Sequence, residues 1–306
     1  MSRQRASRTT MSAAPDIHVM MNGLPGAMGY EVAAACLRKG FKLAPYSLTG
    51  PNIDESEVEV DDLEGGEKTK VKLIKGDADP SLIDSTIQEM KDKFGDGLVV
   101  IDYTHPTAVN SNAEIYCRNG LNFVMGTTGG DREKLLEDTK ESKVYAVIAP
   151  NMGKQIVALQ TAIDYMAREF PGSFSGYKLT VTESHQATKA DTSGTAKTLS
   201  ADLATLTGAP FDVEEIVRIR TKPKQLEFGP TLQVEESALS GHAFHTYSLV
   251  SPDGSAEFQF RHNVSGRRMY ADGTADAVEF LVNEVKRPGS SGKVFSMIDV
   301  LKIGGI

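Results

Sequence analysis

The feature that most constrains the fold is a short apolar run that leads into a glycine-rich turn and then into a helix-forming segment. The run IHVMM is followed by NGLPGAMG, and YEVAAACLRKG then carries apolar residues at helical spacing and ends at Gly40. The turn places Gly23, Gly26 and Gly29 at G-x-x-G-x-x-G spacing. A strand, a glycine turn and a helix in this order predict the first unit of a dinucleotide-binding fold, because the helix N-terminus accommodates a pyrophosphate.

The segments that follow continue the alternation of strands and helices. The predicted strands are FKLAPYSL, LVVIDYT, NFVMGTTGG and YAVIAPN, and the predicted helices are PSLIDSTIQEMKDKFG, HPTAVNSNAEIYCRNG and DREKLLEDTKESK. ESEVEV and TKVKLI alternate polar and apolar residues, which predicts a hairpin at a sheet edge. The repeated order predicts an α/β fold with a Rossmann-type doubly wound parallel sheet.

The pattern changes after Asn151. A long helical segment, KQIVALQTAIDYMAREF, is followed by β-prone runs that continue to about Gly273, and the last segments, TADAVEFLVNEVKRPG and VFSMIDVL, read as helices. We predict a dinucleotide-binding domain over 16–150 with 275–306 packed back onto it. An α+β domain with an open mixed sheet, for substrate binding and oligomerisation, is predicted over 151–274. The Arg- and Ser-rich residues 1–15 are predicted to be a disordered tail or a transit-peptide remnant.

Composition excludes several classes of partner. The net charge of −8 argues against nucleic acid, and no apolar run reaches the length of a membrane span. Cys36 and Cys117 lie in no metal-ligand or redox pattern, which fits core thiols in a reducing compartment. His242, His245 and His262 also lack metal-ligand spacing and are interpreted as strand residues, so no metal site is expected.

The predicted cofactor contacts lie in the glycine turn and at the ends of the predicted strands. PYSLTGPN, at the end of the second predicted strand, lacks the acidic residue that would hold the ribose hydroxyls of NAD. Ser47 and Thr49 offer hydroxyls to a 2′-phosphate there, with Lys39 or Lys42 near, so NADPH is expected and NADH is the alternative. The candidates from position alone are Gly23, Gly26, Gly29, Ser47, His105, Gly126, Thr127 and Thr128.

The stretch VTESHQATKADTSGTAK carries the predicted chemistry. A histidine ordinarily titrates near neutral pH, so His185 is a candidate proton donor or acceptor. Ser193 is a predicted N-cap, so that Gly194 and Thr195 would present free N–H groups at a helix start. With Lys189 close by, that helix start suits a carboxylate.

These residues resemble the motifs of the dihydrodipicolinate reductase family, also called 4-hydroxy-tetrahydrodipicolinate reductases, of lysine and diaminopimelate biosynthesis. The motifs that carry the resemblance, in family order along nearly the whole chain, are GLPGAMG, DYTHP, GTTGG, APNMGK, ESHQATKADTSGT and RRMYADGTA. The resemblance implies a nicotinamide-binding domain and hydride delivery to a small cyclic dicarboxylate. It further implies that the protein forms a homo-oligomer, a dimer or a tetramer.

The same resemblance assigns roles to single residues. Three segments fall on the family's cofactor contacts: Gly23, Leu24, Pro25, Gly26, Ala27 and Met28; Gly126, Thr127 and Thr128; and Ala149, Pro150, Asn151 and Met152. His185 and Lys189 fall on the family's catalytic histidine and lysine. Gly194 and Thr195 fall on its substrate-carboxylate site. The expected substrate contacts are Gln186, Lys189, Ser193, Gly194 and Thr195. Gln186 stands where many bacterial members carry a second histidine, and ESHQA with KADTSGT is similar to the plant-type branch. Membership of that branch implies the plastid stroma, and otherwise the cytoplasm.

Two other functions remain open at this point. One is another two-domain NAD(P)-dependent dehydrogenase of the aspartate pathway, and the other is a non-catalytic dinucleotide-binding sensor. An aldehyde-oxidising enzyme with a thioester intermediate would need a catalytic cysteine, and Cys36 and Cys117 lie within predicted helices. A sensor would have no reason to retain the grouping of His185, Lys189 and the Ser-Gly-Thr segment.

Overall fold

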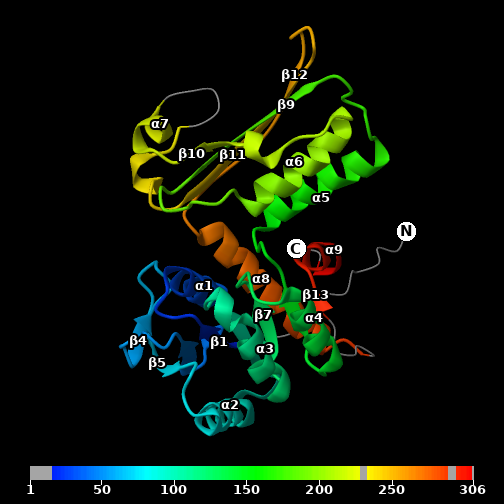
Figure 1. The fold of residues 1–306 in the computed structure, drawn as a ribbon. Coiled ribbons are helices and arrows are strands. Elements are labelled where there is room, and N and C mark those ends of the chain that lie inside the picture. Colours follow the sequence, from blue (N-terminus) through cyan, green and yellow to red (C-terminus); the bar gives the residue numbers. More distant parts are fainter. Residues whose placement is uncertain (1–15, 228–232, 289–293, 305–306) are drawn as a thin grey trace, which may run out of the picture.

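The computed structural model describes residues 16–227, 233–288 and 294–304, so the predicted tail over 1–15 lies outside the described residues. The chain forms one part around a six-stranded sheet and another around a four-stranded sheet, and α5 (Lys154–Glu169) and α8 (Arg268–Val285) lie where the two parts meet (Figure 1). Among the helices in these ranges, none combines the length and apolar character needed to span a membrane.

The first sheet is parallel throughout. Its strands lie in the order β13 (Val294–Phe295), β8 (Ala146–Ile148), β7 (Asn122–Met125), β6 (Leu98–Asp102), β1 (His18–Asn22) and β2 (Lys42–Leu43). One face packs against α1 (Ala27–Arg38), α8 and α9 (Met297–Gly304), and the other against α2 (Pro80–Phe94), α3 (Val109–Arg118) and α4 (Arg132–Glu141). The chain winds in both directions from β1, which confirms the doubly wound fold.

Two predicted elements differ from the structure. FKLAPYSL, predicted as one strand, is divided at Pro45 into β2 and β3 (Tyr46–Thr49), because a proline has no N–H to continue a strand ladder. β3 joins a separate three-stranded sheet with β5 (Thr69–Lys75) and β4 (Glu57–Val60), and the predicted hairpin of these last two is confirmed. VFSMIDVL, predicted as a helix, contains β13 before α9 begins, and Ser296 caps that helix through reciprocal hydrogen bonds with Asp299.

The glycine turn holds the end of β1 against the end of β6. Gly23 has a φ of +106°, and a Cβ there would lie 2.3 Å from the carbonyl oxygen of Tyr103. A Cβ on Gly29 would lie 2.9 Å from the carbonyl oxygen of Gly23, where α1 begins. The glycines are therefore required by the close approach of the chain to itself, which brings the N-terminus of α1 to the carboxyl edge of the sheet.

A buried carboxylate connects several strand ends at this edge. Asp102, at the end of β6, is completely buried and accepts hydrogen bonds from the Tyr116 hydroxyl at 2.6 Å, the Asn112 amide at 2.9 Å and the Thr127 hydroxyl at 2.7 Å. The Tyr116 hydroxyl in turn accepts a hydrogen bond from the Asn22 amide at 2.9 Å, at the end of β1. The network therefore joins β1, β6, α3 and the loop after β7.

The second sheet is mixed, as predicted. Its strands lie in the order β10 (Val217–Ile219), β9 (Lys178–His185), β11 (His242–Val250) and β12 (Glu257–Ser265). β9 runs parallel to β10 and antiparallel to β11. α5 and α6 (Gly194–Thr207) pack on one face of this sheet, α5 through Ile163 and Ala167 and α6 through Leu199, Leu203 and Leu206. α7 (Lys222–Leu226) follows β10. That packing places the N-terminus of α6 beside the carboxyl end of β9 (Figure 1).

We expect Tyr116→Phe to lower the free energy of unfolding by about 1–3 kcal/mol, because it removes the hydroxyl that donates to buried Asp102 and accepts from Asn22. Urea denaturation should show a lower midpoint with an unchanged slope. Tyr165→Phe is the matched control, because Tyr165 is 54% exposed. A Tyr116→Phe protein as stable as the control would contradict a stabilising role for this network.

Candidate active site

The predicted cofactor residues gather at the carboxyl edge of the first sheet. Residues 23–29 follow β1, His105 follows β6, 126–128 follow β7 and 149–152 follow β8. A cavity of about 270 Å³ lies between the last two segments, and it is lined by Thr127, Thr128, Gly129, Gly130, Arg132, Leu135, Ile148, Ala149 and Pro150. Four of the predicted cofactor contacts therefore line one cavity at the edge where ligands of doubly wound sheets bind.

The glycine turn is held in place by its own hydrogen bonds. The Gly26 N–H donates to the Gly23 carbonyl at 2.8 Å, and the Thr49 hydroxyl donates to the Leu24 carbonyl at 2.6 Å. Gly26 is the N-cap of α1 and has no side chain to bind the N–H groups of the first turn. Those N–H groups and the helix dipole make this position suitable for a phosphate group.

The residues expected near a 2′-phosphate make contacts within the chain. Ser47 is completely buried, with its hydroxyl 3.3 Å from the carbonyl oxygen of Leu48, because β3 packs inside the first part of the molecule. Lys39 forms ion pairs with Asp276 and Glu279 on α8, and Lys42 lies 2.8 Å from Asp16. The Ser47 hydroxyl is therefore not accessible to a ligand in this structure, and the other contacts expected near a 2′-phosphate stay predictions.

His105 has a local structural role at its strand end. Its Nδ1 accepts a hydrogen bond from the Thr107 N–H at 3.3 Å and lies 2.9 Å from the Thr107 hydroxyl. It thereby caps the short 3-10 helix Pro106–Ala108, which precedes α3, where the sequence predicted one continuous helix. The ring is exposed, so it remains accessible at the carboxyl edge of the sheet.

The second group of predicted residues lies at the end of β9. Glu183 is completely buried, and its carboxylate pairs with the guanidinium of Arg220 and accepts the Ser193 N–H at 3.0 Å. α6 begins at Gly194 as expected, but the Ser193 side chain makes no capping hydrogen bond. The predicted N-cap position of Ser193 is confirmed, and its backbone N–H binds the carboxylate of Glu183.

Arg220 and Gln225 fix the loop between β9 and α6, and the sequence did not identify either residue. The Arg220 Nε donates to the Lys189 carbonyl at 2.8 Å, and the Gln225 Nε2 donates to the His185 carbonyl at 2.7 Å. Within the loop, the Lys189 N–H donates to the Gln186 carbonyl at 3.0 Å, and the Lys189 Nζ lies 2.8 Å from Asp191. Lys189 is thus placed near His185 with an exposed partner that an anionic ligand can replace.

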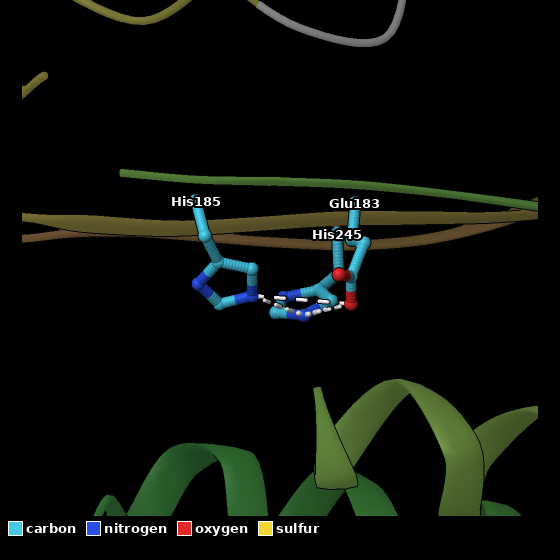
Figure 2. A group of neighbouring side chains, drawn as sticks. All are labelled: Glu183, His185 and His245. Carbon is cyan, nitrogen blue, oxygen red and sulfur yellow. Dashed lines mark hydrogen bonds and ion pairs between the residues drawn. The ribbon is translucent and has the colours of Figure 1, made fainter. Parts of the chain in front are cut away.

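His185 faces a second histidine that the sequence interpretation treated as an ordinary strand residue. The Nε2 atoms of His185 and His245 lie 3.2 Å apart, and the Glu183 carboxylate lies 3.9 Å and 3.8 Å from them (Figure 2). The three side chains project from the sheet toward the face on which the helices lie (Figure 2). Antiparallel pairing of β9 with β11 sets His245 opposite Glu183, a register that no local sequence signal contains.

The environment keeps both rings neutral. Burial, together with the charges of Arg220 and Lys189, lowers the pKa of His185 to about 4. Burial, with smaller effects from His262 and His185, lowers the pKa of His245 to about 2. The Arg220 charge is compensated by Glu183, so the groups that favour an anionic ligand beside these neutral rings are Lys189 and the N-terminus of α6.

The ligand atoms of Glu183, His185 and His245 all lie within 4.8 Å of one another, a donor set of the kind that can hold a metal ion. The sequence predicted no metal site. The carboxylate already pairs with Arg220, and the positive charge of Lys189 lies near the same group. These charges oppose a cation and suit the carboxylates of a substrate.

The two groups of residues meet at the N-terminus of α6. The Asn151 amide, which follows β8, lies 3.5 Å from the Thr195 hydroxyl in the first turn of α6. The side-chain Oδ1 of Asn151 accepts the Gly153 N–H at 2.8 Å, which orients the side chain. The edge that suits a dinucleotide therefore adjoins the His185 and Lys189 grouping, an arrangement in which a hydride could pass between a cofactor and an anionic ligand.

The comparisons with known proteins agree over nearly the whole chain. The family model for the N-terminus of dihydrodipicolinate reductase matches residues 17–152, and the model for its C-terminus matches residues 155–301. A probable 4-hydroxy-tetrahydrodipicolinate reductase 1 of Oryza sativa subsp. japonica, named as chloroplastic, is 44% identical over 297 residues, which cover 96% of this chain and 82% of the relative. The Arabidopsis thaliana 4-hydroxy-tetrahydrodipicolinate reductase 1, also named as chloroplastic, is 44% identical over 290 residues, which cover 95% and 79%.

A solved structure shows the same fold. Dipicolinate-bound dihydrodipicolinate reductase from Paenisporosarcina sp. TG-14 matches with a TM-score of 0.57 and 19% identity, covering 92% of this chain and 97% of that one. The fold, the two family models and the plant relatives agree with the resemblance of the motifs. This chain belongs to the dihydrodipicolinate reductase family.

Proposed function

We propose that this protein reduces 4-hydroxy-tetrahydrodipicolinate to tetrahydrodipicolinate with a reduced nicotinamide cofactor, in the diaminopimelate pathway to lysine. The observation that supports the proposal is the approach of Asn151 to Thr195 at 3.5 Å, because it joins the carboxyl edge of the first sheet to the first turn of α6. The rice and Arabidopsis relatives, 44% identical to this chain, are named for this reaction.

The proposed substrate is a cyclic dicarboxylate that carries a hydroxyl and an imine. Loss of water gives a conjugated C=C–C=N system, and the cofactor supplies a hydride to the carbon that bore the hydroxyl. Lys189 and the N–H groups of Gly194 and Thr195 hold the ring carboxylates, since a cation and a helix N-terminus both stabilise negative charge. His185 delivers the proton that balances the hydride.

The cofactor is a pyridine nucleotide, and we propose that NADPH is preferred to NADH. The support is the segment PYSLTGPN, over 45–52, which contains no carboxylate to hold the ribose hydroxyls of NADH. Because Ser47 is buried, that preference would rest on the missing carboxylate and on groups other than Ser47. The ratio of kcat/KM with the two cofactors measures the preference, and a ratio that favours NADH would reverse it.

The relatives also support a location and an assembly. Because the rice and Arabidopsis relatives are named as chloroplastic, we propose the plastid stroma for this protein. We assign cofactor binding to 16–150 with 275–306, and substrate binding and oligomerisation to 151–274; α8 spans the boundary between the two. A homo-oligomer, a dimer or a tetramer, is the expected assembly, and light scattering of the purified full chain would measure its mass.

The reaction is tested by a coupled assay. The upstream synthase forms the cyclic substrate in place from pyruvate and aspartate semialdehyde, and the absorbance of NADPH is followed. We expect oxidation of NADPH that depends on the synthase. A folded protein that binds NADPH without oxidising it in this assay would instead favour a dinucleotide-binding sensor, and oxidation of NADPH with a semialdehyde alone would favour another dehydrogenase of the aspartate pathway.

We expect His185→Asn to lower kcat by about 10²–10⁴-fold, because the variant lacks the group that transfers the proton. The Kd for NADPH should stay close to that of the parent protein, since His185 lies on β9 and the cofactor edge lies on the other sheet. Steady-state kinetics and a fluorescence titration of NADPH separate the two effects. An undiminished kcat would remove His185 from the mechanism.

We expect Lys189→Ala to lower kcat/KM for the dicarboxylate by about 10- to 100-fold, which corresponds to the loss of about 1.5–3 kcal/mol from a hydrogen bond between charged groups. Lys178→Ala is the matched control, because Lys178 is exposed at the opposite end of β9. Equal effects of the two substitutions would show that Lys189 contributes only general positive charge.

A further inference from the structure

The paired rings of His185 and His245 raise a question about the proton that the proposed reaction needs. Their Nε2 atoms lie 3.2 Å apart, the rings meet edge to face with centroids 5.0 Å apart, and both side chains are buried. At this distance one Nε2 carries a hydrogen and the other accepts it. A neutral pair of this kind has no proton to give, because donation would leave an anionic ring.

The charged and titratable groups around the pair come from several elements. Glu183 on β9 lies 3.9 Å and 3.8 Å from the two Nε2 atoms. Arg220 after β10 and Lys189 in the loop, which pairs with Asp191, add positive charge. The remaining neighbours are His242 and Tyr247 on β11 and His262 on β12, whose ring stacks on His245 at 4.5 Å.

Because of these groups, the free energy of protonating the histidine pair depends on the charge of the bound ligand. In the protein without substrate, Arg220 and Lys189 oppose a further positive charge, and burial adds to this effect. A dicarboxylate held at Lys189 and the start of α6 would bring two negative charges and cancel that repulsion. Glu183 is close enough to stabilise a cation shared between the rings, since its carboxylate lies within 4 Å of both Nε2 atoms.

We propose that His185 and His245 act as one proton-holding pair: binding of the dianionic substrate draws one proton from solvent onto the free Nδ1 of the pair, while the hydrogen already present between the two Nε2 atoms links the rings, so that both share one positive charge. His185 then passes one proton to the reduced ring, and the pair returns to its neutral state. The step consumes one proton from solvent for each hydride transferred, so charge and atoms balance. This inference rests on the proposed function and assigns His245 as a positioning residue that acts through His185.

The pairing also explains a feature of His245. Its Nδ1 is buried and has no hydrogen-bond partner among the described residues. The hydrogen bond that holds the His245 ring is therefore the one between its Nε2 and the Nε2 of His185. An apolar side chain would be more stable at a buried strand position with a purely structural role, since burying an unpaired polar atom costs free energy. A role in holding a proton accounts for an imidazole at this position.

The test is calorimetry of pyridine-2,6-dicarboxylate binding to the full chain in the presence of saturating NADPH. The heat is measured in buffers of different ionisation enthalpy, and the slope counts the protons taken up. We expect about one proton per site near pH 7, with a decrease as the pH rises, because the proton is gained only between the pKa values of the free and bound states. Binding without proton uptake would overturn the inference and leave the proposed function intact.

His245→Gln is the matched variant, because an amide nitrogen can donate to His185 but cannot hold the added proton. We expect it to bind the dicarboxylate with less proton uptake than the parent protein and to lower kcat more than it raises KM. His18→Gln is the control, because His18 lies on β1 in the other sheet and stacks on Phe94. Unchanged proton uptake in His245→Gln would overturn the assignment of His245.

If His245→Gln fails to fold, the parent protein alone still tests the proposal. The dependence of its heat of dicarboxylate binding on the buffer counts the protons without any variant. Absence of dicarboxylate binding, together with no oxidation of NADPH in the synthase-coupled assay, would overturn the proposed function and the inference with it. Oxidation in that assay without proton uptake on binding would overturn only the inference.

Discussion

The buried ion pair of Glu183 and Arg220 is the interaction on which the second half of the site depends. The Glu183 carboxylate has no contact with solvent, and an unpaired charge in such a place would cost several kcal/mol. By binding the Ser193 N–H as well, it ties the end of β9 to the start of α6. Arg220 completes the arrangement by holding the Lys189 carbonyl, so one ion pair positions the strand, the loop and the helix.

Asp102 has the corresponding place in the first sheet. It is also completely buried at a strand end, and it collects donors from α3 and from the loop after β7. In both sheets a buried carboxylate satisfies the donors of the surrounding loops, while the nearby helix start, of α1 or α6, keeps its first N–H groups for a ligand. Buried carboxylates therefore bind the loops, and the N-termini of α1 and α6 keep a positive potential where anions would bind.

That division of charge resolves an apparent conflict between composition and chemistry. A chain with a net charge of −8 has to accommodate a dinucleotide and, under the proposed function, a dicarboxylate. Lys189 and two helix N-termini supply local positive charge, Arg220 is compensated by Glu183, and the buried imidazoles stay neutral. The positive charge that attracts the substrate also opposes a proton on the histidine pair. Under the further inference, the negative charge of the bound substrate removes that opposition.

The sequence by itself determined the features that depend on neighbouring residues. The glycine spacing, the alternation of strands and helices, the hairpin of β4 and β5 and the helix start at Gly194 follow from local preferences and periodicity. The motif around His185 and Lys189 was equally readable, because its members lie within a few residues of one another. The family resemblance rested on the same local motifs, and the comparisons confirmed it.

Only the tertiary structure decided which distant residues complete the site. His245 reaches His185 because β11 pairs with β9 in one register, and a shift by one residue would turn its side chain to the other face of the sheet. Arg220 and Gln225 arrive from the segment after β10, and Ser47 is withdrawn into the interior because β3 leaves the main sheet. Strand partners and register are set by packing of the whole core, so no local pattern in the sequence contains them.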